Sequence, residues 1–187
     1  MSAKDQPEKA GNAPKHVEQP VEPNDATVSA TKENTDRIAT GDAIIHRNML
    51  WSAGAGVLPF PLFDMLALTG VQLKTISELC EVYETPFRQE LFRPLVTSLI
   101  GTLGGSFAGE VVGSSIAKLV PGIGHLLGTA SMSATFAGVT YAVGHLFRDH
   151  FEAGGTAADF NPLRFKDSFK AKVQEGMAKV KSAVPAL

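Results

Sequence analysis

The sequence has few of the residues from which catalytic and metal sites are built. Its one cysteine, Cys80, excludes an internal disulfide and agrees with a reducing compartment. None of its five histidines lies four positions from another, so no two-histidine metal site is expected on a helix. It contains neither a GxSxG turn nor a GxxxxGK[ST] phosphate-binding loop. We therefore expect a protein that is not an enzyme and has no cofactor.

The chain also lacks a strong net charge and an apolar N-terminus. Its net charge of −2 at pH 7 argues against bulk binding of nucleic acid. The first residues, MSAKDQPEKAGNAPKH, contain no apolar run, so we expect no secretory signal peptide. Residues 1–36 are rich in proline and charge and have no aromatic residue. Such a segment buries too little apolar surface to offset its ordering entropy, which predicts a disordered acidic tail over residues 1–36.

What the sequence does have is a regular series of glycines, each four residues after the last. They are Gly101, Gly105, Gly109 and Gly113. Residues four apart share one face of a helix, so these glycines would form a groove without side chains. Glycine costs about 0.5–1 kcal/mol relative to alanine inside a helix. In a bilayer, helices associate through close packing of small residues, so the series predicts a helix packed tightly in or against a membrane.

The rest of the sequence predicts an all-α fold of two helical hairpins and a C-terminal helix. Pro59 and Pro61 separate the first two helices, and Pro121 separates the third from the fourth. The expected helices cover residues 43–58, 61–84, 87–120 and 122–152. Small residues repeat at spacings of four in the fourth helix too, so the second hairpin would pack on itself as a glycine zipper. Its further packing glycines are Gly124, Gly128 and Gly138.

Two of these helices are long enough to span a membrane. A span needs about 20 mainly apolar residues, which 87–120 and 122–152 supply, whereas 43–58 is too short. Basic residues at the open ends of both hairpins predict a membrane domain over 37–155 with both termini in the cytoplasm. The open alternative is a soluble bundle with a glycine-rich core, because Ser and Thr are frequent and the mean hydropathy is only +0.05.

Two acids, Asp64 and Glu110, lie inside the predicted apolar helices. A carboxylate in such surroundings is protonated, paired, or turned toward a water-filled cavity. One interpretation is an ion or proton path through the membrane. The structural interpretation is that Asp64 binds backbone N–H groups after Pro61, and that Glu110 pairs with a base such as Lys118.

The last part of the chain, residues 156–187, is basic. A helix expected over 162–183 combines an apolar stripe with five lysines on its other faces. They are Lys166, Lys170, Lys172, Lys179 and Lys181. This composition is typical of a helix lying in a membrane interface, where the lysines bind anionic lipid. An amphipathic helix docked on the body or on a partner has the same pattern, so both interpretations stay open.

Four stretches, taken in order, resemble a known family. They are PFPLFD at 59–64, QLKTISELCEVYE at 72–84, KLVPGIG at 118–124 and TYAVGHLFRDHFEAGG at 140–155. The family is a small helical domain of unknown function found with Era-like and dynamin-like GTPases in bacteria. Its pattern is matched by Pro59, Pro61, Asp64, Gln72, Leu73, Tyr83, Pro121, Gly122 and Gly124. The resemblance covers residues 42–155 and implies a module associated with the bacterial inner membrane, without a settled reaction. No GTPase domain is recognisable here, so a GTPase is implied only as a partner.

Together these features favour a non-enzymatic membrane protein that self-associates through its glycine-lined hairpin and scaffolds or recruits a partner. Membrane lipid and a second copy of the chain are the expected partners, with a GTPase as a further one and no nucleic acid. A pore or transport component built on the two acids is one alternative. A soluble helical adaptor is the other.

Overall fold

A computed structural model describes residues 25–55, 61–103 and 123–183. The regular structure within these ranges is entirely helical, which confirms the predicted all-α class. The helices are α1 (Asp25–Ala55), α2 (Pro61–Val82), α3 (Gln89–Gly101), α5 (Ile123–Glu152) and α6 (Lys166–Ala183). Four residues of the predicted zipper and ion path lie outside the described residues, so those two hypotheses stay predictions. They are Gly105, Gly109, Glu110 and Gly113.

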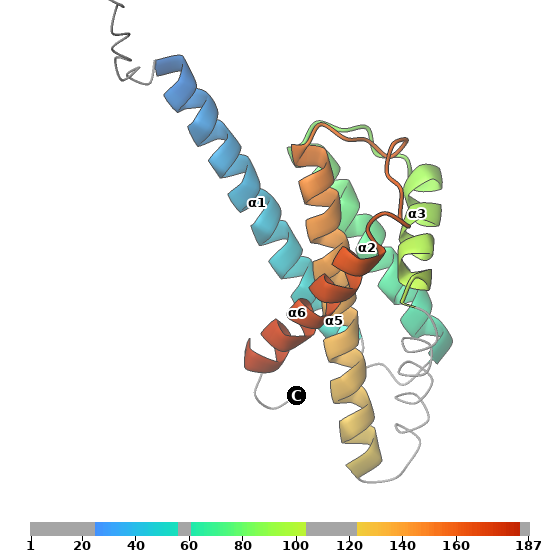
Figure 1. Cartoon of the computed structure of the whole chain (residues 1–187). Coiled ribbons are helices and arrows are strands. Elements are labelled where there is room, and N and C mark those ends of the chain that lie inside the picture. Colours follow the sequence, from blue (N-terminus) through green and yellow to red (C-terminus); the bar gives the residue numbers. More distant parts are fainter. Residues whose placement is uncertain (1–24, 56–60, 104–122, 184–187) are drawn as a thin grey trace, which may run out of the picture.

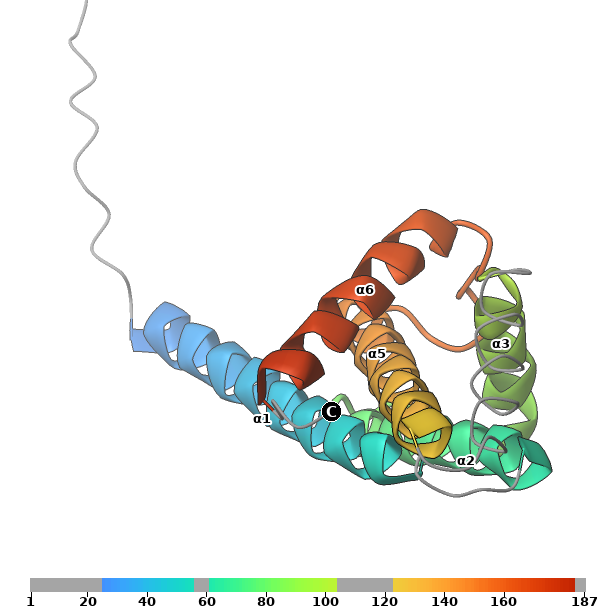
Figure 2. The same cartoon turned by 90° about the horizontal axis from the view of Figure 1, so that it is seen from below.

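The helices run alternately down and up around α5 (Figure 1). The C-terminal ends of α1 and α3 and the N-terminal ends of α2 and α5 lie toward the bottom of Figure 1, which we call the lower end. Helix α5 contacts each of α1, α2, α3 and α6. Seen from below, these four helices are arranged around α5, and α6 crosses it on the side opposite α2 (Figure 2). The core is therefore organised around a single central helix.

Burial explains the apolar character of α5. Every residue from Met132 to Gly144 is buried. A helix that is apolar on all sides is surrounded either by lipid or by other protein segments. Over this stretch, α1, α2 and α6 supply the cover. Among the polar side chains here, the Thr140 hydroxyl accepts from the Gln72 amide of α2 at 2.7 Å, whereas the buried Ser133 hydroxyl has no hydrogen-bond partner among the described residues.

The membrane spans expected at 87–120 and 122–152 are not found in the described part of the chain. No helix within 25–55, 61–103 and 123–183 combines the length and the apolarity that crossing a bilayer requires. Helix α3 ends at Gly101 after 13 residues, where Thr102 and Leu103 form a turn. Helix α5 has 30 residues, but Ser, Thr and His are spread along it.

The helix boundaries differ most from the prediction at the N-terminus. Helix α1 begins at Asp25, so residues 25–36 are helical where the sequence predicted a disordered tail. Alanine, glutamate and lysine in this stretch are strong helix formers. Glu33 also pairs with Arg37 one turn later, at 3.1 Å. The end of α2, by contrast, lies within two residues of the predicted end at residue 84. The helix ends at Val82, and Glu84 adopts a left-handed φ of 51° two residues before Pro86.

Helix α6 docks on α5 through a close contact of two glycines. A Cβ on Gly138 would lie 2.5 Å from the Val173 carbonyl oxygen, and one on Gly176 would lie 2.9 Å from the Gly138 Cα. The apolar stripe of α6, including Phe169 and Val180, is buried there. Of the two interpretations of this helix, the structure shows docking on the body. Gly138 thus meets α6, where the sequence had expected it to face the preceding helix of the second hairpin.

Candidate functional site

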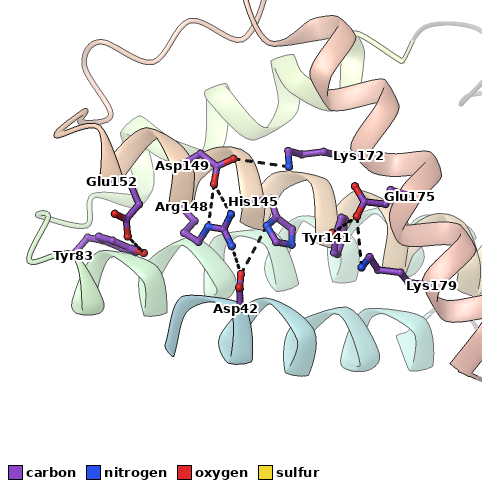
Figure 3. Close-up of polar contacts among 10 residues, drawn as sticks. All are labelled: Asp42, Tyr83, Tyr141, His145, Arg148, Asp149, Glu152, Lys172, Glu175 and Lys179. Carbon is purple, nitrogen blue, oxygen red and sulfur yellow. Dashed lines mark hydrogen bonds and ion pairs between the residues drawn. The ribbon is translucent and has the colours of Figure 1, made fainter. Parts of the chain in front are cut away.

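A polar cluster occupies the place where α1, α5 and α6 meet (Figure 3). Helix α5 supplies residues at positions 141, 145, 148 and 149, which the helical repeat places on neighbouring faces. Helix α6 faces them with residues at positions 172, 175 and 179, and α1 contributes one acid at position 42. The members of this cluster are Asp42, Tyr141, His145, Arg148, Asp149, Lys172, Glu175 and Lys179.

Arg148 connects the three helices through alternating charges. Its guanidinium pairs with Asp42 of α1 and, at 2.6 Å, with the neighbouring Asp149. The second oxygen of Asp149 lies 3.8 Å from the Lys172 ammonium of α6. Burial lowers the pKa of Arg148, but the Asp149 and Asp42 carboxylates raise it above its ordinary value overall. The Arg148 side chain is only 15% exposed, so this chain of ion pairs is shielded better than a surface pair would be.

A phenol and a carboxylate form a second link between α5 and α6. The Tyr141 hydroxyl donates to Glu175 Oε1 at 2.6 Å. The Lys179 ammonium lies 3.5 Å from the same oxygen and 5.4 Å from the centre of the Tyr141 ring. Burial, and then the bond to the carboxylate, raise the pKa of Tyr141 well above its usual range. The phenol is therefore a stable donor that holds α6 in place.

His145 borders a cavity of about 330 Å³ in this cluster. The cavity is lined by Asp42, Ile45, His46, Tyr141, His145 and Lys179. The His145 ring nitrogen Nδ1 is buried, lies 3.9 Å from Asp42 Oδ1, and makes no hydrogen bond within the described residues. Burial, together with the Arg148 and Lys172 cations, lowers the pKa of His145 to about 4, against the opposing effect of the Asp42 and Asp149 carboxylates. The imidazole is consequently neutral at physiological pH.

The second tyrosine of the chain makes the same kind of link on another helix pair. The Tyr83 hydroxyl at the end of α2 donates to Glu152 Oε1 of α5 at 2.6 Å (Figure 3). Burial and the Glu152 carboxylate raise the pKa of Tyr83. A Cβ on Gly41 of α1 would lie 3.4 Å from this hydroxyl and from the Arg148 side chain, so this part of α1 is within van der Waals reach of both. All these contacts fasten outer helices to α5.

The chemistry of these groups suits mutual attachment better than catalysis. Each carboxylate of the cluster is bound to a cation or a phenol, and the histidine is held neutral. The Cys80 thiol is buried, and its pKa is raised to about 12 by burial and by Glu81, which disfavours the nucleophilic thiolate. No group of three or more metal-ligating side chains is assembled in the described ranges.

The structure separates the predicted lipid-binding lysines into two groups. Lys172 and Lys179 face α5 and take part in the polar cluster. Lys166, Lys170 and Lys181 are exposed and make no ion pair with any described residue. Only the second group is turned fully toward the surroundings.

The remaining predicted residues are placed only in part. Asp64 belongs to the first turn of α2, and its side chain lies outside the described part of the chain. Gly124 and Gly128 belong to the first turns of α5, where burial is likewise not described. Gly101 is the last residue of α3, and a Cβ there would meet nothing within 4 Å. These residues are not brought together with the polar cluster.

Sequence reasoning missed the polar cluster almost entirely. The sequence predicted neither tyrosine as a hydrogen-bond donor. The available signals were the rarity of tyrosine, of which the chain has two, and the place of Tyr83 and of the stretch 140–155 in the family resemblance. The acidic partners of the two tyrosines lie 69 and 34 positions away, so no local pattern could pair them.

Comparison with known proteins finds a matching family and a similar magnetosome protein. The family described as "Domain of unknown function (DUF697)" matches residues 26–181, which extends beyond the predicted 42–155 at both ends. The chain is 32% identical over 152 residues to magnetosome membrane protein 22 of Magnetospirillum gryphiswaldense, covering 81% of this chain and 78% of that protein. No solved structure matches. The GTPase association that the resemblance implied stays a prediction.

Proposed function

The chain belongs to the family described as a domain of unknown function (DUF697), and on that premise we propose that it is a membrane-associated, non-enzymatic helical protein that scaffolds or recruits a partner. The observation that carries the proposal is its match to a magnetosome membrane protein. That match spans about four fifths of both chains, so it concerns the whole helical body rather than one motif.

The geometry supports a role in holding and positioning. The ionisable groups between α1, α5 and α6 neutralise one another and fix the relative places of three helices. A scaffold needs such a fixed body, whereas an acid–base catalyst needs a titratable group free to exchange its proton near pH 7. Within the cluster, His145 is held neutral, and the pKa of Tyr141 lies far above that range.

Flotation of the purified full chain with vesicles tests membrane association. We expect it to float with phosphatidylcholine vesicles that contain phosphatidylglycerol, and in cells to sediment with the bacterial inner membrane. A chain that remains at the bottom of the gradient with every vesicle composition, and in the cleared lysate after cell breakage, would refute the proposal.

The exposed lysines of α6 supply a test of anionic lipid binding. A basic residue near an anionic surface contributes about 1 kcal/mol, so Lys166→Gln with Lys170→Gln should weaken binding to phosphatidylglycerol vesicles by roughly tenfold or more. Arg88→Gln with Arg93→Gln removes two exposed charges at α3 and serves as the matched control. Equal loss in both double variants would show that total charge matters and the position on α6 does not.

The scaffold role predicts self-association on the membrane. Chemical cross-linking of the vesicle-bound chain should give dimers or higher oligomers, and dilution of the chain over more vesicle surface should reduce them. Monomers alone at every surface density would contradict the scaffold role while leaving membrane association intact.

A further inference from the structure

The last two turns of α1 carry an exposed apolar face. Trp51 is 69% exposed and its neighbour Leu50 is 44% exposed. Arg47 and Gly54, one turn to either side, are exposed on the same face, while Met49 is 1% exposed and belongs to the core. Over these turns, α1 therefore carries large apolar side chains on its exposed face as well as on its buried face.

An exposed tryptophan beside an exposed leucine contributes little to folding. Isolated apolar side chains are common on protein surfaces, whereas large contiguous exposed apolar patches mark surfaces where proteins or membranes bind. Tryptophan has a large apolar ring and one N–H donor, and it is enriched where apolar and aqueous regions meet at a membrane surface.

The position of this face points to a lipid bilayer as the occupant. Helix α1 ends at Ala55, four residues or about 6 Å beyond Trp51, and this is the lower of its two ends in Figure 1, above the first turns of α5. The link that follows, residues 56–60, has the sequence GVLPF and no polar side chain. The other link joined to the lower end, residues 104–122, contains one acid and one base among mainly small and apolar residues. Both links that join these helix ends are therefore mainly apolar in sequence.

The charge beside this face suits anionic headgroups. The Arg47 side chain is 54% exposed and that of Lys74 is 55% exposed. Both contact Glu78, at 2.7 Å and 2.5 Å, so two cations share one carboxylate. Burial raises the pKa of Glu78, but the bonds to Lys74, Asn48 and Arg47 lower it overall, so the carboxylate stays ionised and the group keeps one net positive charge.

We propose that Leu50 and Trp51 form the membrane-docking face of this protein, with the indole at headgroup level and with Arg47 and Lys74 toward anionic lipid. The inference rests on the proposed function, because it needs a chain that binds membranes. It adds to that function the end of the bundle that meets the bilayer and the two residues that enter it.

Trp51 is the one tryptophan of the chain, so intrinsic fluorescence reports on this face directly. The full chain is titrated with phosphatidylcholine vesicles containing phosphatidylglycerol. We expect a blue shift of the emission, loss of quenching by aqueous iodide, and quenching by lipids brominated near the headgroup. Trp51→Ala should weaken vesicle binding at least about tenfold, since a large apolar side chain loses its burial. Because Trp51 is mostly exposed, the far-UV circular dichroism of the Trp51→Ala variant should match that of the unchanged chain.

A tryptophan at the other end of the same helix is the matched control. Val28 is 52% exposed and lies 23 residues before Trp51, about 35 Å along α1. In the Trp51→Phe, Val28→Trp variant, we expect the emission to stay unshifted and open to iodide when vesicles are added. A blue shift at both positions would overturn the assignment to the lower end, because α1 would then lie along the membrane.

Flotation run on the same samples separates this inference from the proposed function. If the chain floats with vesicles while the Trp51 emission stays unshifted and open to iodide, the docking face is wrong and membrane association stands. If the chain does not float, both are wrong. If the emission shifts with protein concentration in the absence of vesicles, a second copy covers Trp51 and the lipid assignment is overturned.

Discussion

Substitution of Gly138 by alanine should destabilise the protein, although alanine is the better helix former. Gly138 lies in the middle of α5, where a Cβ would come within 2.5 Å of the Val173 carbonyl oxygen and 2.6 Å of Met177 Cγ. The methionine side chain can move, but the carbonyl belongs to the backbone of α6. Helix α6 would have to retreat by roughly 1 Å to restore a normal contact.

The magnitude follows from two opposing contributions. Alanine favours the helix by about 0.5–1 kcal/mol. Overpacking of a tight contact costs about 1–3 kcal/mol, and here it also loosens the buried Phe169 and Val180. The net effect of Gly138→Ala should be a loss of about 1–2 kcal/mol. For a chain of this length, that loss lowers the Tm by roughly 2–8 °C.

Thermal and urea unfolding followed by circular dichroism measure this effect against a matched glycine. Gly70→Ala in α2 adds the same methyl group at an exposed position where a Cβ would meet nothing within 4 Å. It should stabilise the protein by about 0.5–1 kcal/mol. Opposite signs for the two variants support the close approach of α5 and α6. A stabilising Gly138→Ala would refute it.

Three further predictions concern the polar groups. Tyr83→Phe leaves the Glu152 carboxylate without its donor and should lower the free energy of unfolding by about 1–3 kcal/mol; an unchanged urea midpoint would contradict this. The folded-state pKa of His145 is about 4, below its ordinary 6.5, so the unfolded state binds more protons between these values. Stability should therefore fall as the pH drops from about 6.5 to 4, and this fall should be shallower in His145→Gln; parallel curves would dismiss His145 as the cause. The buried Cys80 thiol should react with a disulfide reagent only after denaturation, and rapid labelling in plain buffer would show that the site opens.

The candidate site could not be predicted from the sequence, for a physical reason. The ion pairs join Asp42 to Arg148 and Asp149 to Lys172, which come from three helices. In the sequence, a charged residue whose partner lies on another helix cannot be distinguished from an ordinary solvated surface charge, because a surface charge needs no partner. The amphipathic pattern of α6 was visible, yet the same pattern fits a lipid surface and a helix-binding groove.

For the exposed face at Leu50 and Trp51, the sequence shows the helical pattern but does not show which side of the helix is buried. Helical spacing places Arg47 and Trp51 on one face, and any helical wheel reveals this. That wheel does not show which face the core takes, since Ile45 and Met49 supply an equally apolar alternative. The structure buries Ile45 and Met49 and leaves Trp51 exposed.

By itself, the sequence determined the helical class, the starts of α2 and α5 just after Pro59 and Pro121, and the end of α2 near Pro86, because proline and helical periodicity act within a few residues. Tertiary structure alone decided what surrounds α5. An all-round apolar helix has the same composition whether lipid or protein covers it, and only the packed arrangement shows α1, α2 and α6 around it. It also decided that Gly138 meets Gly176, because a contact between backbones far apart in the chain leaves no local signature.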